Sequence, residues 1–148
     1  MVNNKKGFTL IELLVVIGIL AVLLAIVLIA INPARQFAQA NDTKRRSDVN
    51  AILNAIHQYM AENGGSPPAA ITTTAGVISD AGIDICAALV PTYIAELPAD
   101  PSLNNGTPIP ATCPAGYTTG YTVVRSTTDS RISVSATSSS GQPITVTR

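Results

Sequence analysis

The hydrophobic and polar positions divide the chain into three stretches of different character. Residues 8–31, FTLIELLVVIGILAVLLAIVLIAI, are almost entirely apolar, and Glu12 is the one charged residue among them. Because a bilayer core requires about 20 apolar residues of helix, this stretch is long enough to span a membrane. A buried helix of a soluble protein usually keeps some polar face, and this stretch almost completely lacks one.

The second stretch, residues 32–62, combines charged residues with one apolar stripe at three- and four-residue spacing. The stripe consists of Val49, Ile52, Leu53, Ile56, Tyr59 and Met60. This spacing predicts an amphipathic helix that packs against the rest of the chain. Pro33 removes one helix hydrogen bond, so we expect a kink or local loosening after Asn32. The segment 63–68, NGGSPP, predicts the end of the helix.

The third stretch, residues 63–148, is rich in Thr, Ser, Pro, Gly and Ala. Three of its segments show two-residue alternation or many β-branched residues and are predicted strands: 121–125, 131–136 and 144–147. Residues 71–91 are predicted to form an irregular connection with a short helix around 87–90. The expected fold class is α+β, with a long N-terminal helix packed on a small antiparallel β-meander head.

Two simpler explanations of the apolar stretch fit its residues less well. A secretory signal has an apolar core of about 7–15 residues followed by a cleavage site, and this stretch is longer and continues as helix. A plain membrane anchor leaves Glu12 unexplained, because a charge in an apolar span costs about 2.5–3.5 kcal/mol at mid-membrane. Lys5 and Lys6 precede the stretch and favour a cytoplasmic N-terminus, which sends the head to the other side.

Charge and cysteine content limit the possible functions. Nine basic and nine acidic residues cancel, so no nucleic-acid partner is expected. Cys86 and Cys113 form no C-x-x-C pair, and His57 is remote from both in the sequence, so a zinc site is not expected. His57 is expected to be a partly exposed helix residue. Outside the cytoplasm a disulfide between the two cysteines is expected, with buried free thiols as the alternative. No cluster of residues indicates an enzyme.

Residues 5–14, KKGFTLIELL, resemble the prepilin signature shared by type IV pilins and type II secretion pseudopilins. The shared features are a short basic leader that ends in glycine, a Gly7–Phe8 junction, a glutamate at the fifth position after that junction, and a spanning apolar run. The resemblance is close over residues 5–31. Beyond them it extends only to the general layout of the pilin fold.

The resemblance implies a sequence of processing and assembly steps. A prepilin peptidase in the membrane would cut between Gly7 and Phe8, and the new amine of Phe8 would be methylated. Glu12 would then pair with the Phe8 ammonium of a neighbouring subunit in a filament core. The implied organisation is a leader (1–7), a transmembrane and assembly helix (8–31), an amphipathic helix (32–62) and a globular head (63–148).

The implied partners are further copies of the chain, the prepilin peptidase, the membrane and a pilus assembly platform. The precursor is expected to cross the cytoplasmic (inner) membrane once with its head outside, and the mature subunit to lie in an extracellular filament. The leading interpretation is a structural subunit of an extracellular type IV pilus used for adhesion, motility or surface contact. The alternatives are a major pseudopilin of a type II secretion system and a DNA-uptake pilin.

Two further segments carry competing interpretations. Residues 97–101, LPADP, resemble a segment of major pseudopilins, and in some relatives this loop binds calcium. Asp100 is a weak calcium candidate, with Ser102, Asn104 and Asn105 as further oxygen donors, but one carboxylate is few for calcium and a structural Asp-Pro turn is expected instead. No other cofactor is expected. The basic residues 44–46 lie in the helix between the apolar stretch and the head. They are either solvent-exposed there or partners for acidic residues of adjacent subunits.

Overall fold

The computed structural model describes residues 7–148. Its residues form two compact units, one ending at Ala38 and the other running from Gln39 to Arg148. Lys5, Lys6 and most of the predicted leader lie outside the described residues.

The first unit contains helix α1, which spans Leu10–Ile31 and coincides with the apolar stretch. None of its 22 residues is buried. It is the one helix among the described residues that is long and apolar enough to cross a membrane. Exposure of so many large apolar side chains to water would be costly, so α1 requires an apolar environment that the chain itself does not supply.

A break at Asn32 separates α1 from helix α2, Pro33–Glu62. Asn32 adopts a left-handed conformation with φ 45°, and its backbone carbonyl accepts a hydrogen bond of 3.1 Å from the Arg35 N–H. Pro33 then begins α2, where the missing N–H of proline removes no intrahelical bond. The predicted loosening after Asn32 is therefore an interruption between two helices, and the predicted end at Glu62 is confirmed.

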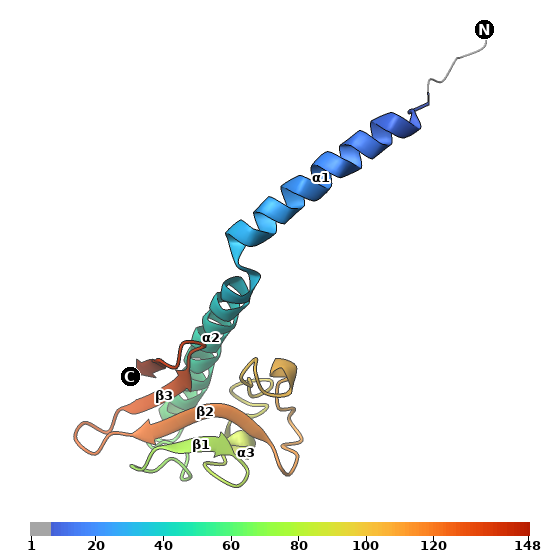
Figure 1. Cartoon of the computed structure of the whole chain (residues 1–148). Coiled ribbons are helices and arrows are strands. Elements are labelled where there is room, and N and C mark those ends of the chain that lie inside the picture. The colour runs from blue at the N-terminus through green and yellow to red at the C-terminus, as the bar shows by residue number, and fades with distance from the viewer. Residues whose placement is uncertain (1–6) are drawn as a thin grey trace. The chain divides into compact units, whose positions relative to one another are not determined.

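The head contains one four-stranded antiparallel sheet in the order β1-β2-β3-β4 (Figure 1). The strands are β1 Gly76–Ser79, β2 Thr118–Arg125, β3 Ile132–Thr137 and β4 Pro143–Thr147. The three predicted strands are confirmed with small shifts of their ends. The prediction that residues 71–91 are irregular is wrong at β1, a four-residue strand with a register shift between Val77 and Ser79. The expected short helix is α3, Cys86–Leu89.

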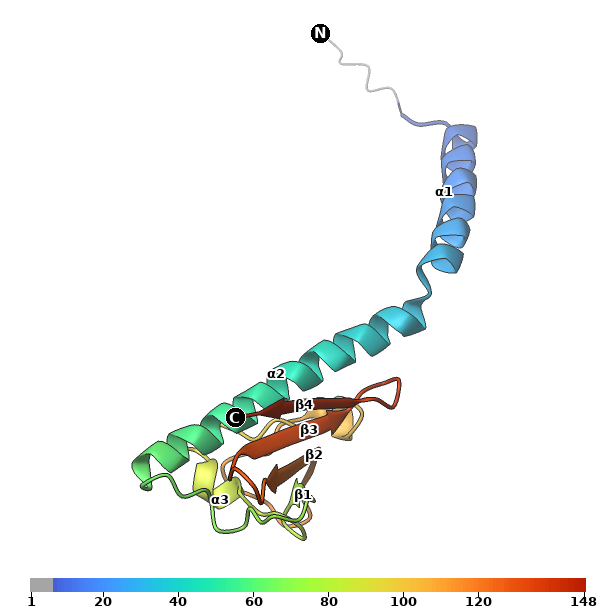
Figure 2. The same cartoon turned by 90° about the vertical axis from the view of Figure 1, so that its left-hand side faces the viewer.

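The core lies between α2 and one face of the sheet. Figure 2 shows α2 running beside the strands. Val49, Ile52 and Ile56 of α2 are fully buried. The sheet contributes alternate residues from its strands, including Val123 and Val134, which pair across β2 and β3. The predicted packing of the apolar stripe against the sheet is thus confirmed, since alternation places every second side chain on the α2 face.

Candidate functional site

The start of α1 places the Glu12 carboxylate beside the N-terminal end of the helix. Thr9 is the N-cap residue, and its Oγ1 accepts a hydrogen bond of 3.3 Å from the Glu12 N–H. In return, Glu12 Oε2 accepts bonds from the Thr9 N–H at 2.8 Å and the Thr9 hydroxyl at 2.7 Å. This reciprocal capping box satisfies backbone donors that a helix start leaves open. It fixes the carboxylate in place while leaving it exposed.

The two residues of the predicted cleavage junction are exposed. Phe8 is 86% exposed. A Cβ added to Gly7 would meet no atom within 4 Å, so the fold itself places no steric demand for glycine at this position.

Arg45 is the buried charge that sequence reasoning missed. The residue is 5% exposed, and its guanidinium forms a bidentate ion pair with Asp100, with Nε–Oδ2 at 2.7 Å and Nη2–Oδ1 at 2.9 Å. It also donates to Asp42 Oδ1 at 2.8 Å and to the Ser139 hydroxyl at 2.9 Å. These contacts, which we call the Arg45 clamp, join α2 to the loop after Ala99 and to the β3–β4 turn.

The contacts of the Arg45 clamp change the pKa values of its two carboxyl groups. Burial raises the pKa of Asp100, but hydrogen bonds from Arg45 and Ser102 outweigh that effect and lower the pKa to about 2. The Asp42 pKa is also lowered, chiefly by the hydrogen bond from the Ser139 N–H. Both carboxyl groups are therefore ionised at neutral pH, as an ion pair with arginine requires.

The hypothesis that residues 44–46 pair with neighbouring subunits is wrong for Arg45, whose partners lie in its own chain. Lys44 likewise binds Asp48 at 2.8 Å and approaches the Ala99 carbonyl oxygen at 3.4 Å. Asp48 also accepts a 2.7 Å bond from the Tyr121 hydroxyl. Burial, with this bond to a carboxylate, raises the pKa of Tyr121. Among these three basic residues, only Arg46 has no side-chain partner in residues 7–148.

Asp100 lies in the predicted Asp-Pro turn. Its backbone carbonyl accepts a bond of 2.9 Å from Leu103 N–H, and its Oδ1 accepts one of 2.8 Å from Ser102 N–H. Because the guanidinium of Arg45 bonds both carboxylate oxygens, a calcium ion would compete with it for the same atoms. Across residues 7–148, no three His, Cys, Asp or Glu side chains gather in a group that could hold a metal ion.

The expected disulfide between Cys86 and Cys113 is present, with the two Cα atoms 5.9 Å apart. It connects the start of α3 to the segment that leads into β2. The loop that it closes contains Asp100, so the disulfide limits the freedom of the loop that supplies the main partner of Arg45.

Loss of the disulfide is expected to lower the free energy of unfolding by about 3 kcal/mol, because an open loop of this length gains chain entropy in the unfolded state. Denaturant unfolding with and without reductant should show this as a lower midpoint in the reduced protein. A Cys86→Ala/Cys113→Ala variant is the control, since reductant should not change its midpoint. An equal midpoint for the oxidised and reduced native chain would contradict the expectation.

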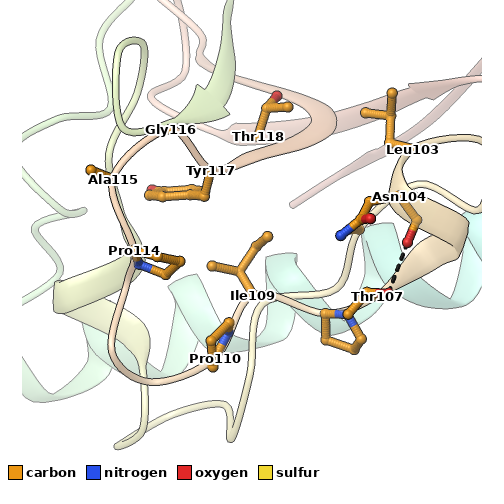
Figure 3. Close-up of a pocket in the computed structure, with 12 residues that line it drawn as sticks. Leu103, Asn104, Thr107, Ile109, Pro110, Pro114, Ala115, Gly116, Tyr117 and Thr118 are labelled. Carbon is orange, nitrogen blue, oxygen red and sulfur yellow. Dashed lines mark hydrogen bonds between the residues drawn. The ribbon is translucent and has the colours of Figure 1, made fainter.

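A groove of about 440 Å³ lies beside this loop, between residues 103–110 and 114–118 (Figure 3). Its walls are mostly apolar and include Ile109, Pro110 and Tyr117. The Tyr117 hydroxyl is bonded to Asp84 at 2.7 Å. The groove thus offers no cluster of free acids, bases or nucleophiles. His57, half-buried on α2, has a buried Nε2 without a hydrogen-bond partner among the described residues.

Comparison with known proteins finds a family motif that includes the start of α1. The family described as "Prokaryotic N-terminal methylation motif" matches residues 2–28. The type IV wide pilus major component PilA4 of Thermus thermophilus is 41% identical over 61 residues, which cover 41% of this chain and 45% of that protein. The match therefore spans less than half of the relative's length. No solved structure matches the chain significantly.

The methylation motif concerns the N-terminal part of the chain, and the arrangement of helices and strands is a separate observation. An apolar helix followed by an amphipathic helix on a four-stranded antiparallel sheet is the layout expected of a pilin. In its N-terminal methylation motif, in its curated relative and in its fold, this chain is similar to type IV pilins.

Proposed function

We propose that this chain is the precursor of a structural subunit of an extracellular type IV pilus-like filament. It is cut after Gly7, methylated on the Phe8 amine and polymerised through α1. The observation that carries the proposal is the start of α1, where an oriented carboxylate lies in the first turn of a helix that has no buried residue. Such a helix needs an apolar surrounding, which lipid supplies before assembly and neighbouring copies of α1 supply afterwards.

The geometry of Glu12 suits a charge partner from another subunit. Both hydrogen bonds from Thr9 reach Oε2, and Oε1 receives none from the described residues. The free oxygen can accept the Phe8 ammonium that cleavage creates on a neighbouring chain. Pairing offsets the desolvation of both charges in a dry filament core, and it fixes the axial register of adjacent subunits.

Gly7 supports the proposed cleavage. Since no neighbouring atom requires a glycine there, the residue has no evident role in the folded chain. A glycine is well suited to pass through the narrow cleft of a protease, because it has no side chain to collide with the cleft wall.

The proposed precursor crosses the cytoplasmic membrane once through α1, with its head outside. The disulfide supports this placement, because disulfides persist in oxidising compartments. The proposed partners are the prepilin peptidase, the pilus assembly platform and further copies of the chain. Type IV pilins are structural subunits, and we propose no catalytic activity for this chain.

A secretion pseudopilin is the second candidate, favoured by the segment 97–101 and its turn at Asp100. A DNA-uptake pilin has less support. It would need an exposed cationic stripe, whereas Arg131 is paired with Asp129 at 3.2 Å and Arg148 donates to Asn54 at 2.7 Å.

Electron microscopy of surface material from cells that produce the full chain, with N-terminal sequencing of the main protein, tests the proposal. Long filaments of a protein that begins with Phe8 are expected. Gly7→Val is the matched variant, and its bulkier side chain should leave an uncut precursor in the membrane and no filaments. Filaments built from uncut chains, or a cut chain that never polymerises, would contradict the proposal.

A further inference from the structure

The acidic side chains of the unit Gln39–Arg148 accept hydrogen bonds from within the chain, with one exception. Asp42, Asp48, Glu62, Asp80, Asp84, Asp100 and Asp129 each accept at least one hydrogen bond from within the chain. Glu96 is exposed and accepts none from residues 7–148. A lone exposed carboxylate is ordinary, but the same chain also carries an exposed basic side chain without a side-chain partner among the described residues, on a different surface.

This basic side chain is Arg46, which is exposed and has no side-chain partner among the described residues. It lines a groove of about 340 Å³ between α2 and β4, together with Asn50 and Thr145. β4 is the last strand of the sheet, so one of its edges is open. Ile132 and Arg148 exchange both backbone hydrogen bonds, and the alternation of antiparallel pairs therefore turns the Thr145 N–H towards the open edge.

The groove offers donors of hydrogen bonds and a positive charge. The Arg46 guanidinium and the Thr145 N–H both suit a carboxylate, which accepts from several donors and forms two parallel bonds with arginine. A carboxylate at the end of a flexible side chain is therefore the group that fits it best.

Glu96 lies on the opposite flank of α2. The segment that contains it runs beside the helix, since Tyr93 contacts Tyr59 with ring centroids 5.7 Å apart and the Ala99 carbonyl oxygen lies 3.4 Å from Lys44 Nζ. Arg46 instead faces β4, as does Asn54 through its bond to Arg148. In Figure 1 the dark red C-terminal strand and the yellow-to-orange connection accordingly lie on different sides of α2.

We infer that Arg46 of one head binds Glu96 of a neighbouring copy, across a contact between the α2–β4 groove and the segment 93–99. The two charges lie on different flanks, so one subunit cannot satisfy its own pair. A contact between two different patches is heterologous, and repetition of it gives an open helical array rather than a closed dimer. The inference rests on the proposed filament function and names the contact between heads that accompanies packing of α1.

Cysteine cross-linking tests the contact directly in the full chain in its membrane. Both native cysteines are in the disulfide, and the described residues contain no free thiol. After mild oxidation, Arg46→Cys/Glu96→Cys should give a ladder of covalent multimers on a non-reducing gel. Arg46→Cys and Glu96→Cys alone should stop at dimers, because each head then carries a single new thiol.

Charge exchange tests the energy of the contact. Arg46→Glu and Glu96→Arg should each lower filament yield by about tenfold or more, because like charges then meet at every repeat. The double exchange should return yield to within about threefold of the native chain, since the pair is restored with opposite polarity. Arg125→Glu is the matched control, because it changes net charge equally at an arginine outside the groove.

The outcomes separate this inference from the proposed function. Filaments without a ladder, or an equal loss with Arg125→Glu, would overturn the Arg46–Glu96 contact and leave the filament subunit intact. A ladder in membranes that never produce filaments would support the contact and overturn the filament. If neither a ladder nor filaments formed, the Arg46–Glu96 contact and the proposed filament function would both be overturned.

Discussion

Replacement of Glu12 with Gln is expected to reduce filament assembly by about 100-fold or more while cleavage after Gly7 proceeds normally. The reason is electrostatic, because loss of one partner of a buried ion pair typically costs about 3–5 kcal/mol. Filament yield in sheared surface fractions and the N-terminal sequence of the membrane-bound protein provide the two measurements. Normal filament yield would refute a pairing between Glu12 and the Phe8 ammonium.

The choice of Gln separates two roles of Glu12. Its amide oxygen can still accept the hydrogen bonds that Thr9 donates to Oε2, so the capping box can persist while the charge is lost. Glu12→Ala removes both and should fail equally. Thr9→Ala removes the cap and keeps the charge, and it should cost about 1 kcal/mol of helix stability with only a moderate loss of filaments. If Thr9→Ala failed as completely as Glu12→Gln, capping rather than charge would explain the defect.

The sequence predicted those features that depend on neighbours along the chain. The apolar stretch defines α1, and the glycines and prolines after Glu62 define the end of α2. Alternation in β2, β3 and β4 is strong because one face of each strand is buried. β1 escaped prediction because it has only four residues, begins at Gly76 and contains a register shift. Four residues are too few for alternation to be distinguished from chance.

The Arg45 clamp could not be predicted with the same ease, because its main pair joins residues 55 positions apart. In the sequence Arg45 stands between Lys44 and Arg46 as one of three equivalent cations. One signal was available, since Arg45 lies four residues before Val49 and therefore in phase with the buried stripe of α2. A basic residue in phase with such a stripe must find an acidic partner, but only the fold identifies that partner as Asp100.

Removal of either charge of the Arg45–Asp100 pair is expected to lower the free energy of unfolding by about 3 kcal/mol, because the remaining partner is buried without its counter-ion. Suitable variants are Arg45→Met and Asp100→Asn, which keep similar volumes. Their double variant should lose much less than the sum of the single losses, since neither charge is then left alone. The chain contains no tryptophan, so tyrosine fluorescence of the detergent-solubilised full chain can follow denaturant unfolding, with Tyr121 as a buried reporter.

Two comparisons make this prediction specific. Arg46→Met removes the adjacent, exposed cation and should change stability by less than about 0.5 kcal/mol. The pH dependence gives the second comparison, because the Asp100 pKa falls from an ordinary 3.8 to about 2 on folding. A lowered pKa means that this stabilisation is complete above about pH 5 and is lost as the pH falls towards 2. The native chain should therefore lose stability over that range more steeply than Asp100→Asn. Parallel pH profiles, or an Arg46→Met variant as unstable as Arg45→Met, would show that the clamp does not hold the head together.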